Sequence, residues 1–273
     1  MLKFMSLSSG SCGNCYFLGW QPDEETPLRG ILIDAGVSLR ALKRNLRLYG
    51  LGTDCFDAIL VTHDHFDHIR HLGSFCSHLH KPVYASRTLH DALSRHFATR
   101  DAIVPCRKYL QAGEWNTIPV GSGSLRVRYF VVPHDATETC GFFIRFGGEN
   151  FVLMTDVGRV TPESLEYARQ ADTLVIESNY DTQMLIGGPY PHQLKMRICG
   201  GPGHMSNDEC AGTIKQIWHD GLRNIFLCHL SENNNTPEAA FACAARALVE
   251  LGVKETVRLQ TLPRQTATPL ILL

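Results

Sequence analysis

Residues 59–69 read Ile-Leu-Val-Thr-His-Asp-His-Phe-Asp-His-Ile, an apolar run that leads directly into a dense cluster of polar side chains. The six residues from His63 to His68 supply three imidazoles and two carboxylates, which are the ligand types of divalent transition metals. The apolar run predicts a strand, and the irregular backbone at its end can spread the ligands around ions. The alternative is a solvated polar turn, but globular sequences rarely place these residue types so densely.

Further candidate ligands follow strand-like runs downstream. His134 follows residues 127–133, Asp156 follows residues 151–155 and His229 follows residues 225–228. Asp34 ends another run and is either a ligand or a residue that supports one. Each of these taken alone is more simply a hydrogen-bonded residue at a strand end. Their repetition predicts one shared metal site at one edge of the sheets.

The remaining pattern alternates strands with helices. Short β-branched or aromatic runs predict strands over residues 30–34, 58–62, 125–133, 141–146, 151–155, 173–177 and 224–228. Leucine spacing, a capping box and an early proline predict helices over residues 38–49, 206–220 and 236–251. Without an internal repeat or long linker, we expect a single α/β domain over residues 1–273, with sheets covered by helices.

Composition excludes several classes of protein. The 26 basic and 27 acidic residues give a net charge of −1, which excludes a protein held to nucleic acid by bulk charge but allows a local phosphate site. No apolar run approaches the roughly 18 residues of a membrane helix, and no signal peptide is evident, so we expect a cytoplasmic protein without a membrane partner. Its ten cysteines are expected to be reduced thiols. Cys12 and Cys15 lack the context of a redox pair or a zinc ribbon.

The order of these motifs resembles the metallo-β-lactamase superfamily. The resemblance implies an αββα sandwich with the metal site at the edge between the two sheets. It also implies two divalent ions, one held by His63, His65 and His134 and the other by Asp67, His68 and His229, with Asp156 bridging them. This mixed nitrogen and oxygen set suits zinc, manganese or iron. The chain is too short for an inserted β-CASP domain, and too little follows His229 for the helical substrate domain of glyoxalase II-type enzymes.

Residues 200–211 contain a glycine loop that ends at His204 and precedes a capped helix. This segment is similar to the histidine loop of RNase Z-type phosphodiesterases. The resemblance implies that His204 donates a proton to the leaving group and that Glu177, at the end of a predicted strand, orients it. The alternatives are a turn histidine at position 204 and a helix-capping or salt-bridged glutamate at position 177.

Distinctive segments at residues 6–14, 177–181, 188–198 and 203–207 resemble the small stand-alone bacterial nucleases of the YycJ/WalJ type. This resemblance implies a metal-dependent phosphodiesterase, an exonuclease acting on DNA in the 5′ to 3′ direction. Two ions would clamp the phosphodiester and generate hydroxide, while Asp67 accepts its proton. The rival hypotheses are a small-molecule hydrolase that cleaves a cyclic phosphodiester, thioester or lactone at the same metals, and a non-catalytic metal-binding protein. The sequence does not determine whether the substrate is DNA or RNA, from which end it is degraded, or the oligomeric state of the protein.

Candidate substrate contacts come from two segments. Ser9, Ser11 and Asn14 lie in an expected glycine-rich loop and can donate hydrogen bonds to phosphate, or else form a plain turn. Lys195 and Arg197 precede the His204 loop and either follow the nucleic-acid backbone or form surface ion pairs. Four further basic residues share one face of the helix predicted over residues 38–49, which is either a solvated surface or a phosphate track: Arg40, Lys43, Arg44 and Arg47.

Overall fold

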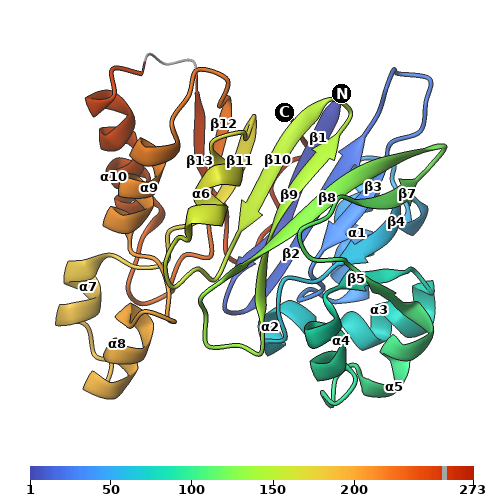
Figure 1. The fold of residues 1–273 in the computed structure, drawn as a ribbon, viewed down its shortest axis with the longest axis horizontal. Coiled ribbons are helices and arrows are strands. Elements are labelled where there is room, and N and C mark those ends of the chain that lie inside the picture. Colours follow the sequence, from blue (N-terminus) through green and yellow to red (C-terminus); the bar gives the residue numbers. More distant parts are fainter. Residues whose placement is uncertain (254–256) are drawn as a thin grey trace.

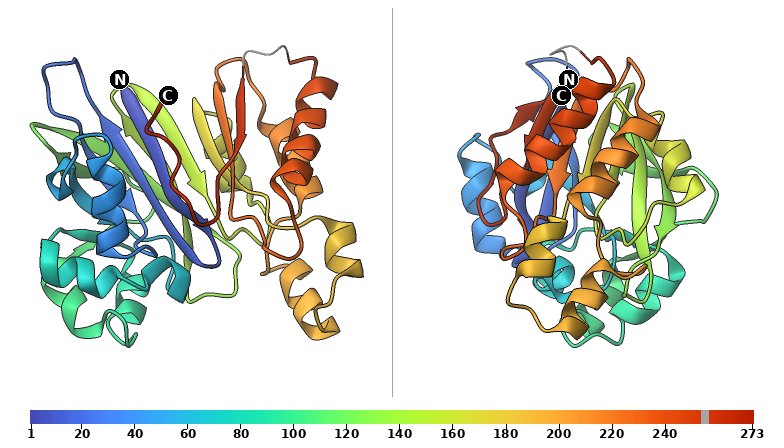
Figure 2. Two further views of the ribbon diagram at one scale, coloured as in Figure 1. Left: turned by 180° about the vertical axis from the view of Figure 1, so that it is seen from behind. Right: turned by 90° about the vertical axis from the view of Figure 1, so that its left-hand side faces the viewer.

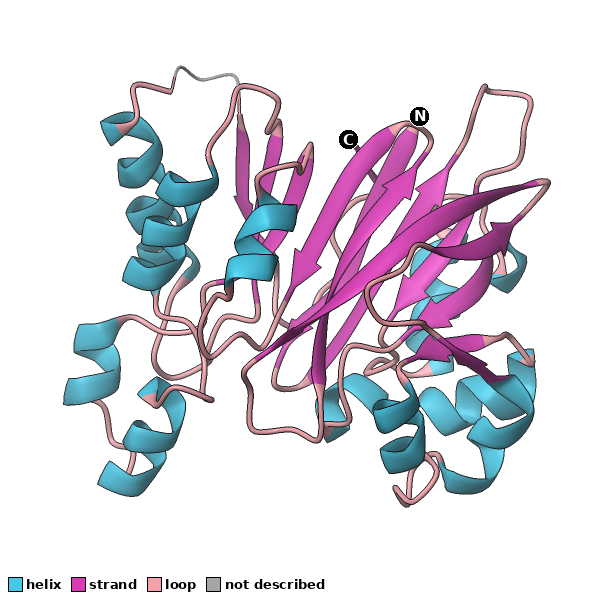
Figure 3. Ribbon diagram, viewed as in Figure 1, coloured by secondary structure: helices cyan, strands magenta, loops and turns pink. Residues whose placement is uncertain are grey.

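Two seven-stranded sheets form the centre of the computed structural model, which describes residues 1–253 and 257–273 (Figures 1 and 3). The first sheet runs, in spatial order, through β14 (Ile271–Leu272), β1 (Leu2–Gly10), β2 (Gly13–Trp20), β3 (Arg29–Ile33), β4 (Phe56–Leu60), β5 (Val83–Ala85) and β6 (Arg107–Tyr109). The second runs through β13 (Arg258–Thr261), β12 (Asn224–Cys228), β11 (Thr173–Glu177), β10 (Glu149–Met154), β9 (Thr139–Phe146), β8 (Gly123–Val132) and β7 (Asn116–Val120).

Helices cover the outer face of each sheet (Figures 1 and 2). The first sheet is covered by α1 (Leu39–Arg47), α3 (Leu72–Leu79), α4 (Arg87–Leu93) and α5 (Arg100–Ile103). The second is covered by α6 (Pro162–Ala168), α9 (Asn207–Ile217) and α10 (Pro237–Glu250). Three short helices lie at the lower edge in Figure 1: α2 (Phe66–Ile69), α7 (Thr182–Gly187) and α8 (His192–Cys199). Two 3-10 turns span Thr53–Cys55 and Val104–Cys106. Among the described helices, none has the length and apolar character needed to cross a bilayer.

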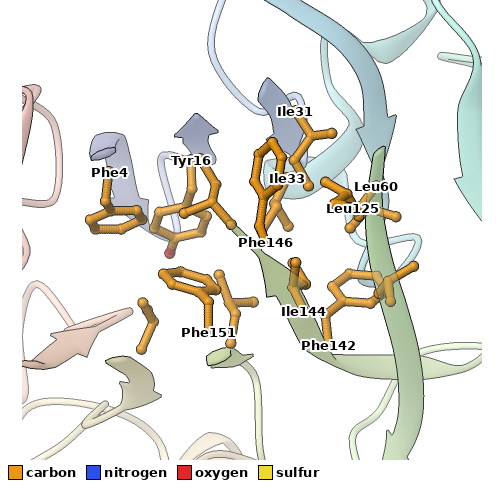
Figure 4. Packing of buried hydrophobic residues seen from close by; sticks show 14 of the residues in the cluster. Phe4, Tyr16, Ile31, Ile33, Leu60, Leu125, Phe142, Ile144, Phe146 and Phe151 are labelled. Atoms are coloured by element: carbon orange, nitrogen blue, oxygen red, sulfur yellow. The ribbon is translucent and has the colours of Figure 1, made fainter. Parts of the chain in front are cut away.

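The main core fills the space between the two sheets (Figure 4). Alternate side chains of each strand point inward, as the two-residue period of a strand requires. Phe4 of β1 packs on Phe151 of β10 and Phe226 of β12, with ring centroids 5.6 and 5.1 Å apart. Separate apolar clusters lie between each sheet and its helices. The predicted αββα sandwich is therefore confirmed.

The predicted strands and helices all occur, with ends shifted by a few residues. The amino-terminal segment differs from the expected glycine-rich loop. It forms the hairpin of β1 and β2, with Gly10 paired to Gly13 and only residues 11 and 12 in the turn. Nearly every residue of both strands is buried, because each has a layer on both faces. The alternation of apolar and polar residues that reveals a half-buried strand is therefore missing from this segment.

Candidate metal centre

The candidate ligands lie where neighbouring strands end. His134 follows β8, Asp156 follows β10 and His229 directly follows β12. Strands β10, β11 and β12 are parallel, so their carboxyl ends meet at one edge of the second sheet. His63 follows β4 of the first sheet at the same edge of the sandwich. The topology thus brings distant segments of the chain into one centre.

Three strand-end residues adopt left-handed backbone conformations that side chains other than glycine rarely accept. The φ angles are 61° at Asp34, 56° at Asp156 and 54° at His229. Such residues typically cost about 1–3 kcal/mol each, and they gather at functional sites where the surrounding fold holds them. The chain turns sharply at each of these positions as it leaves its strand.

The centre contains two triads with the composition of transition-metal sites. Nitrogen atoms of His63, His65 and His134 lie within 4.8 Å of one another, and the same limit holds for ligand atoms of Asp67, His68 and His229. Asp156 lies between the triads. Its Oδ2 is 3.2 Å from His68 Nε2 and its Oδ1 is 3.7 Å from His134 Nε2. The structure therefore brings together all seven predicted ligands, and its candidate groups include the two triads that the resemblance implied, together with a group of His63, His68 and Asp156 and a group of Asp156, Glu177, His204 and His229.

Hydrogen bonds determine which ring nitrogen of each histidine carries a proton. His134 Nδ1 donates to the carbonyl oxygen of Gly203 (2.8 Å), and His65 Nε2 donates to that of Asp135 (3.1 Å). His68 Nδ1 donates to Asp34 Oδ2 (2.7 Å). When each of these rings is neutral, the opposite nitrogen carries the lone pair that can bind a metal. This pattern, in which an acceptor outside the site fixes the tautomer, is typical of metal-binding histidines.

The rings of His63 and His229 test most directly whether a cation fits this centre. His229 Nδ1 donates to Glu177 Oε1 (3.0 Å), and His63 Nδ1 lies 3.0 Å from the Thr62 hydroxyl, which donates to Asp34. The Nε2 atom of His63 is buried and has no hydrogen-bond partner among the described residues, whereas the buried Nε2 atom of His229 lies 3.5 Å from Asp67 Oδ2. Leaving a buried polar atom unpaired is costly, and a cation would satisfy the lone pair of His63 and could take the place of the proton on His229. The donor set therefore fits divalent metal ions.

Buried carboxylates give the centre an excess of negative charge. Burial alone would lower the pKa of His68, but the charges of Asp156, Asp34 and Asp67 outweigh burial and raise this pKa to about 10. Burial likewise opposes ionisation of Asp156, yet the surrounding imidazoles hold its pKa well below the usual range. Without metal, protons on the histidines must balance the carboxylates. Divalent ions can replace these protons.

The predicted pair of His204 and Glu177 is in direct contact. His204 Nδ1 donates to Glu177 Oε1 (2.8 Å), while Glu177 Oε2 accepts from the backbone N–H groups of Val157 (2.7 Å) and Met205 (3.2 Å). Burial opposes protonation of His204, but the charge and hydrogen bond of Glu177 outweigh it and raise the pKa of this imidazole. A Cβ at Gly203 would lie 2.1 Å from the Ile198 carbonyl oxygen, so the loop before His204 packs on α8 only with glycine there.

A cleft of about 190 Å³ opens onto the centre. Candidate ligands and His204 line it, and the rest of its wall consists of Ser11, Asp135, Leu194, Arg197, Ile198 and Gly203. Arg197 Nε donates to Asp135 Oδ2 (2.5 Å), so this guanidinium is held at the cleft. Lys195 is held elsewhere. Its Nζ donates to the Ile186 carbonyl oxygen (2.6 Å), and it lines a different pocket, between α7 and α8.

Two predicted substrate contacts, Ser9 and Asn14, are buried and touch the ligands instead. Ser9 Oγ accepts from the backbone N–H of His229 (3.0 Å). Asn14 Nδ2 donates to Asp67 Oδ2 (3.0 Å) and lies 2.8 Å from His68 Nε2. These contacts hold the metal candidates in place. Of the three residues predicted from this segment, Ser11 reaches the cleft.

Three further residues support the candidate ligands, and of these the sequence predicted a supporting role only for Asp34. Asp34 accepts from His68 and from both the backbone N–H and the hydroxyl of Thr62. Asn179 Nδ2 donates to the carbonyl oxygen of His229 (2.7 Å). Asp34 carried a signal, because it ends a predicted strand as the ligands do. Thr62 and Asn179 lie within the quoted segments 59–69 and 177–181, but no pattern distinguishes them from their neighbours.

Comparison with known proteins identifies the family of this chain. A family model described as the beta-lactamase superfamily domain matches residues 29–229. A Bacillus anthracis protein named exodeoxyribonuclease YycJ is 32% identical over 252 residues, covering 92% of this chain and 90% of the relative. A Streptococcus pneumoniae protein named exodeoxyribonuclease WalJ is 31% identical over 273 residues, covering 98% and 97%.

Solved structures resemble the fold at low sequence identity. Unliganded yeast PDE1 superposes with a TM-score of 0.72 at 14% identity, covering 100% of both chains. The metallo-beta-lactamase fold protein YhfI from Bacillus subtilis superposes with a TM-score of 0.67 at 15% identity, covering 98% of this chain and 99% of that one. At these identities the likeness shows the shared fold.

Proposed function

Because this chain belongs to the metallo-β-lactamase superfamily and is a metal-dependent hydrolase of that fold, we propose that it is an exonuclease that hydrolyses DNA phosphodiester bonds with two divalent metal ions. Two relatives that share nearly its whole length are named exodeoxyribonucleases. The observation that carries the proposal is the 2.8 Å contact between His204 and Glu177 beside Asp156, because it supplies a proton donor next to the candidate metals.

In this proposal His63, His65 and His134 would hold one ion and Asp67, His68 and His229 would hold the other, while Asp156, which lies between the triads, would contribute ligand oxygens. Bound ions of this kind neutralise phosphate charge and lower the pKa of water towards neutrality. Zinc and manganese both suit the ligands, and iron fits the same set.

The side chains of the cleft then divide the proton transfers between them. Asp67, whose carboxylate is held by Asn14, accepts the proton of the attacking water. Attack on phosphorus releases an alkoxide, which leaves readily only when it is protonated. His204 donates that proton, and Glu177 orients the ring and stabilises its charged form. Ser11 and Arg197 stand at the wall of the cleft, where they can bind phosphate oxygens.

Two broader features belong to the same proposal. We place the protein in the cytoplasm, because all ten cysteines in the described part of the chain are free, as in a reducing compartment. We also propose that residues 1–273 act as one metallo-β-lactamase-like domain without a β-CASP insertion, because the strands of both sheets share one core.

The test is to incubate the purified protein with Mn²⁺ or Zn²⁺ and end-labelled DNA, RNA or bis-p-nitrophenyl phosphate. We expect DNA to be shortened progressively from one end, and chelation to stop the reaction. If the protein hydrolyses bis-p-nitrophenyl phosphate but degrades neither DNA nor RNA with either metal, the proposal is wrong and a small-molecule hydrolase is the better interpretation.

A further inference from the structure

A groove without acidic residues lies next to the metal cleft. It has a volume of about 600 Å³ and is lined chiefly by residues of α1, by residues 36–38 before that helix, by Cys12 and by residues 265–267. Arg44 of α1 and Arg70, which follows α2, supply positive charge, and none of the lining residues is acidic. We call this groove the basic groove. A concave surface of one charge concentrates ions of the opposite charge.

One turn of the chain separates the basic groove from the metal cleft. The two residues in the turn of the β1–β2 hairpin face different sides, because Ser11 lines the cleft and Cys12 lines the groove. Gly36, which also lines the groove, donates its backbone N–H to the carbonyl oxygen of Asn14 (2.8 Å). A Cβ at Gly36 would lie 1.9 Å from the Asp67 carbonyl oxygen, so the groove wall packs directly on the backbone of a candidate ligand. A ligand that leaves the cleft across this turn therefore enters the groove.

The positive charges of this region have no acidic partners. Arg44 and Arg70 are exposed, and within the described ranges no carboxylate lies within ion-pair distance of either one. Helix α1 contains no Asp or Glu, and its basic residues follow one another at spacings of three and four, at which like charges repel on a helix. These basic residues are Arg40, Lys43, Arg44 and Arg47. A bound anion would relieve the repulsion between them.

These features select for a chain of phosphates. Guanidinium groups bind phosphate oxygens, often through two parallel hydrogen bonds. Hydroxyl and amide groups of Ser38, Asn45 and Thr266 add neutral donors to the lining. A small anion would occupy the groove without reaching the cleft. A DNA backbone is charged at every nucleotide and is long enough to occupy both.

We propose that the basic groove binds the sugar–phosphate backbone of the DNA beyond the nucleotide whose phosphate lies in the metal cleft, with Arg44 and Arg70 each contacting a phosphate. The inference rests on the proposed nuclease function and adds a backbone-binding site to it. Contacts of this kind position the DNA without reading its bases. The groove therefore contributes the same affinity for every base sequence.

Binding of labelled DNA to metal-loaded protein tests the groove, with His204→Ala as the parent because slow cleavage preserves the DNA during the measurement. In this parent, Arg44→Gln and Arg70→Gln should each reduce the slope of log affinity against log salt by about 0.7–0.9. The loss of affinity should consequently be about threefold larger at about 50 mM than at about 200 mM salt. Arg44→Lys should keep the slope, because it keeps the charge. Arg246→Gln is the matched control, since Arg246 is exposed on α10, which covers the other sheet, and it should leave the slope unchanged.

Methylphosphonate linkages, each of which removes the charge of one phosphate, provide the second measurement. Placed one at a time along the DNA, a linkage beyond the cleft should weaken binding to the parent protein but not to Arg44→Gln, which already lacks the partner charge. If no position behaves in this way, or if Arg44→Gln and Arg70→Gln have the slope of Arg246→Gln, the groove does not bind DNA, even where the wild type hydrolyses it. Reduced slopes in a protein whose wild type hydrolyses no DNA would overturn the proposed function instead and leave the groove as a DNA-binding site.

Discussion

Asp34 shows how much of the centre depends on residues that do not themselves face the cleft. Its carboxylate fixes the orientation of His68 and, through the Thr62 hydroxyl, that of His63, so one buried side chain positions a candidate ligand in each triad. Acceptors of this kind fix the tautomer of a ligand and increase its basicity. Asp34 therefore contributes to the free energy of metal binding although it is not itself a predicted ligand of either triad.

Replacing Asp34 with Asn should weaken metal binding roughly 10- to 100-fold, because the amide cannot accept every hydrogen bond that the carboxylate accepts. Titration of metal-free protein against a competing chelator measures this change. Asp91→Asn, on the exposed surface of α4, should leave the affinity unchanged. Equal affinities for the two variants would show that Asp34 does not support the ligands.

His204 allows chemistry to be separated from metal binding. His204→Ala should retain the metal content and lose on the order of 10²–10⁴ in rate on DNA, the usual effect of removing a general acid. The loss should be smaller on bis-p-nitrophenyl phosphate, because nitrophenolate leaves without a proton. Equal losses on both substrates would argue for a role in substrate positioning.

Arg197 and Lys195 lie two positions apart on α8 but differ in their contacts. Arg197→Gln should weaken DNA binding and reduce the slope of log affinity against log salt by about 0.7–0.9, the effect of losing one phosphate contact. Lys195→Gln should leave that slope unchanged, since Lys195 faces a different pocket. Binding isotherms at several salt concentrations measure both slopes, and identical slopes would remove Arg197 from the substrate path.

At the scale of elements, backbone strain also occurs away from the centre. His80, which follows α3, has a φ of 51°, the left-handed conformation in which glycine is favoured at helix ends. His80→Gly should therefore raise the free energy of unfolding by about 0.5–1 kcal/mol, after allowance for the flexibility of glycine in the unfolded chain. His78→Gly, within α3, should lower it by about 1 kcal/mol. Urea denaturation measures both changes.

The sequence predicted elements that carry a strong pattern and missed those that do not. Strand ends followed by His or Asp were visible because a buried strand is a continuous apolar run and its terminal polar residue stands out. The hairpin of β1 and β2 was missed, since its serines and asparagine are buried and bonded inside the fold. Whether Asn14 touches substrate or Asp67 depends on the pairing of β1 with β2, which no local pattern contains.

At the scale of the whole molecule, metal binding and stability should respond to pH together. In the metal-free protein the pKa of His68 is raised to about 10 and that of His229 is also raised. Their protonation stabilises the fold below the unfolded pKa of about 6.5, and this stabilisation is lost as the pH rises towards 10. Metal binding strengthens over the same range, because fewer protons compete for the ligands.

The difference in Tm between metal-loaded and metal-free protein should consequently widen as the pH rises from about 6.5 to 10. Thermal unfolding of dialysed and metal-loaded samples measures this difference. Calorimetry at pH 8 in buffers of different ionisation enthalpy should also detect protons released on metal binding, whereas histidines of ordinary pKa would release almost none. A constant difference in Tm, together with no proton release, would contradict the raised pKa values.

The left-handed backbone at Asp34, Asp156 and His229 has an evolutionary consequence. A glycine at any of these three positions would relieve the local strain and favour folding, but it would delete a functional side chain. Selection for stability and selection for activity therefore act in opposite directions at the same residues. In homologues that no longer need the catalytic activity, substitution by glycine at these positions would be favoured, and such substitutions would indicate that the activity had been lost.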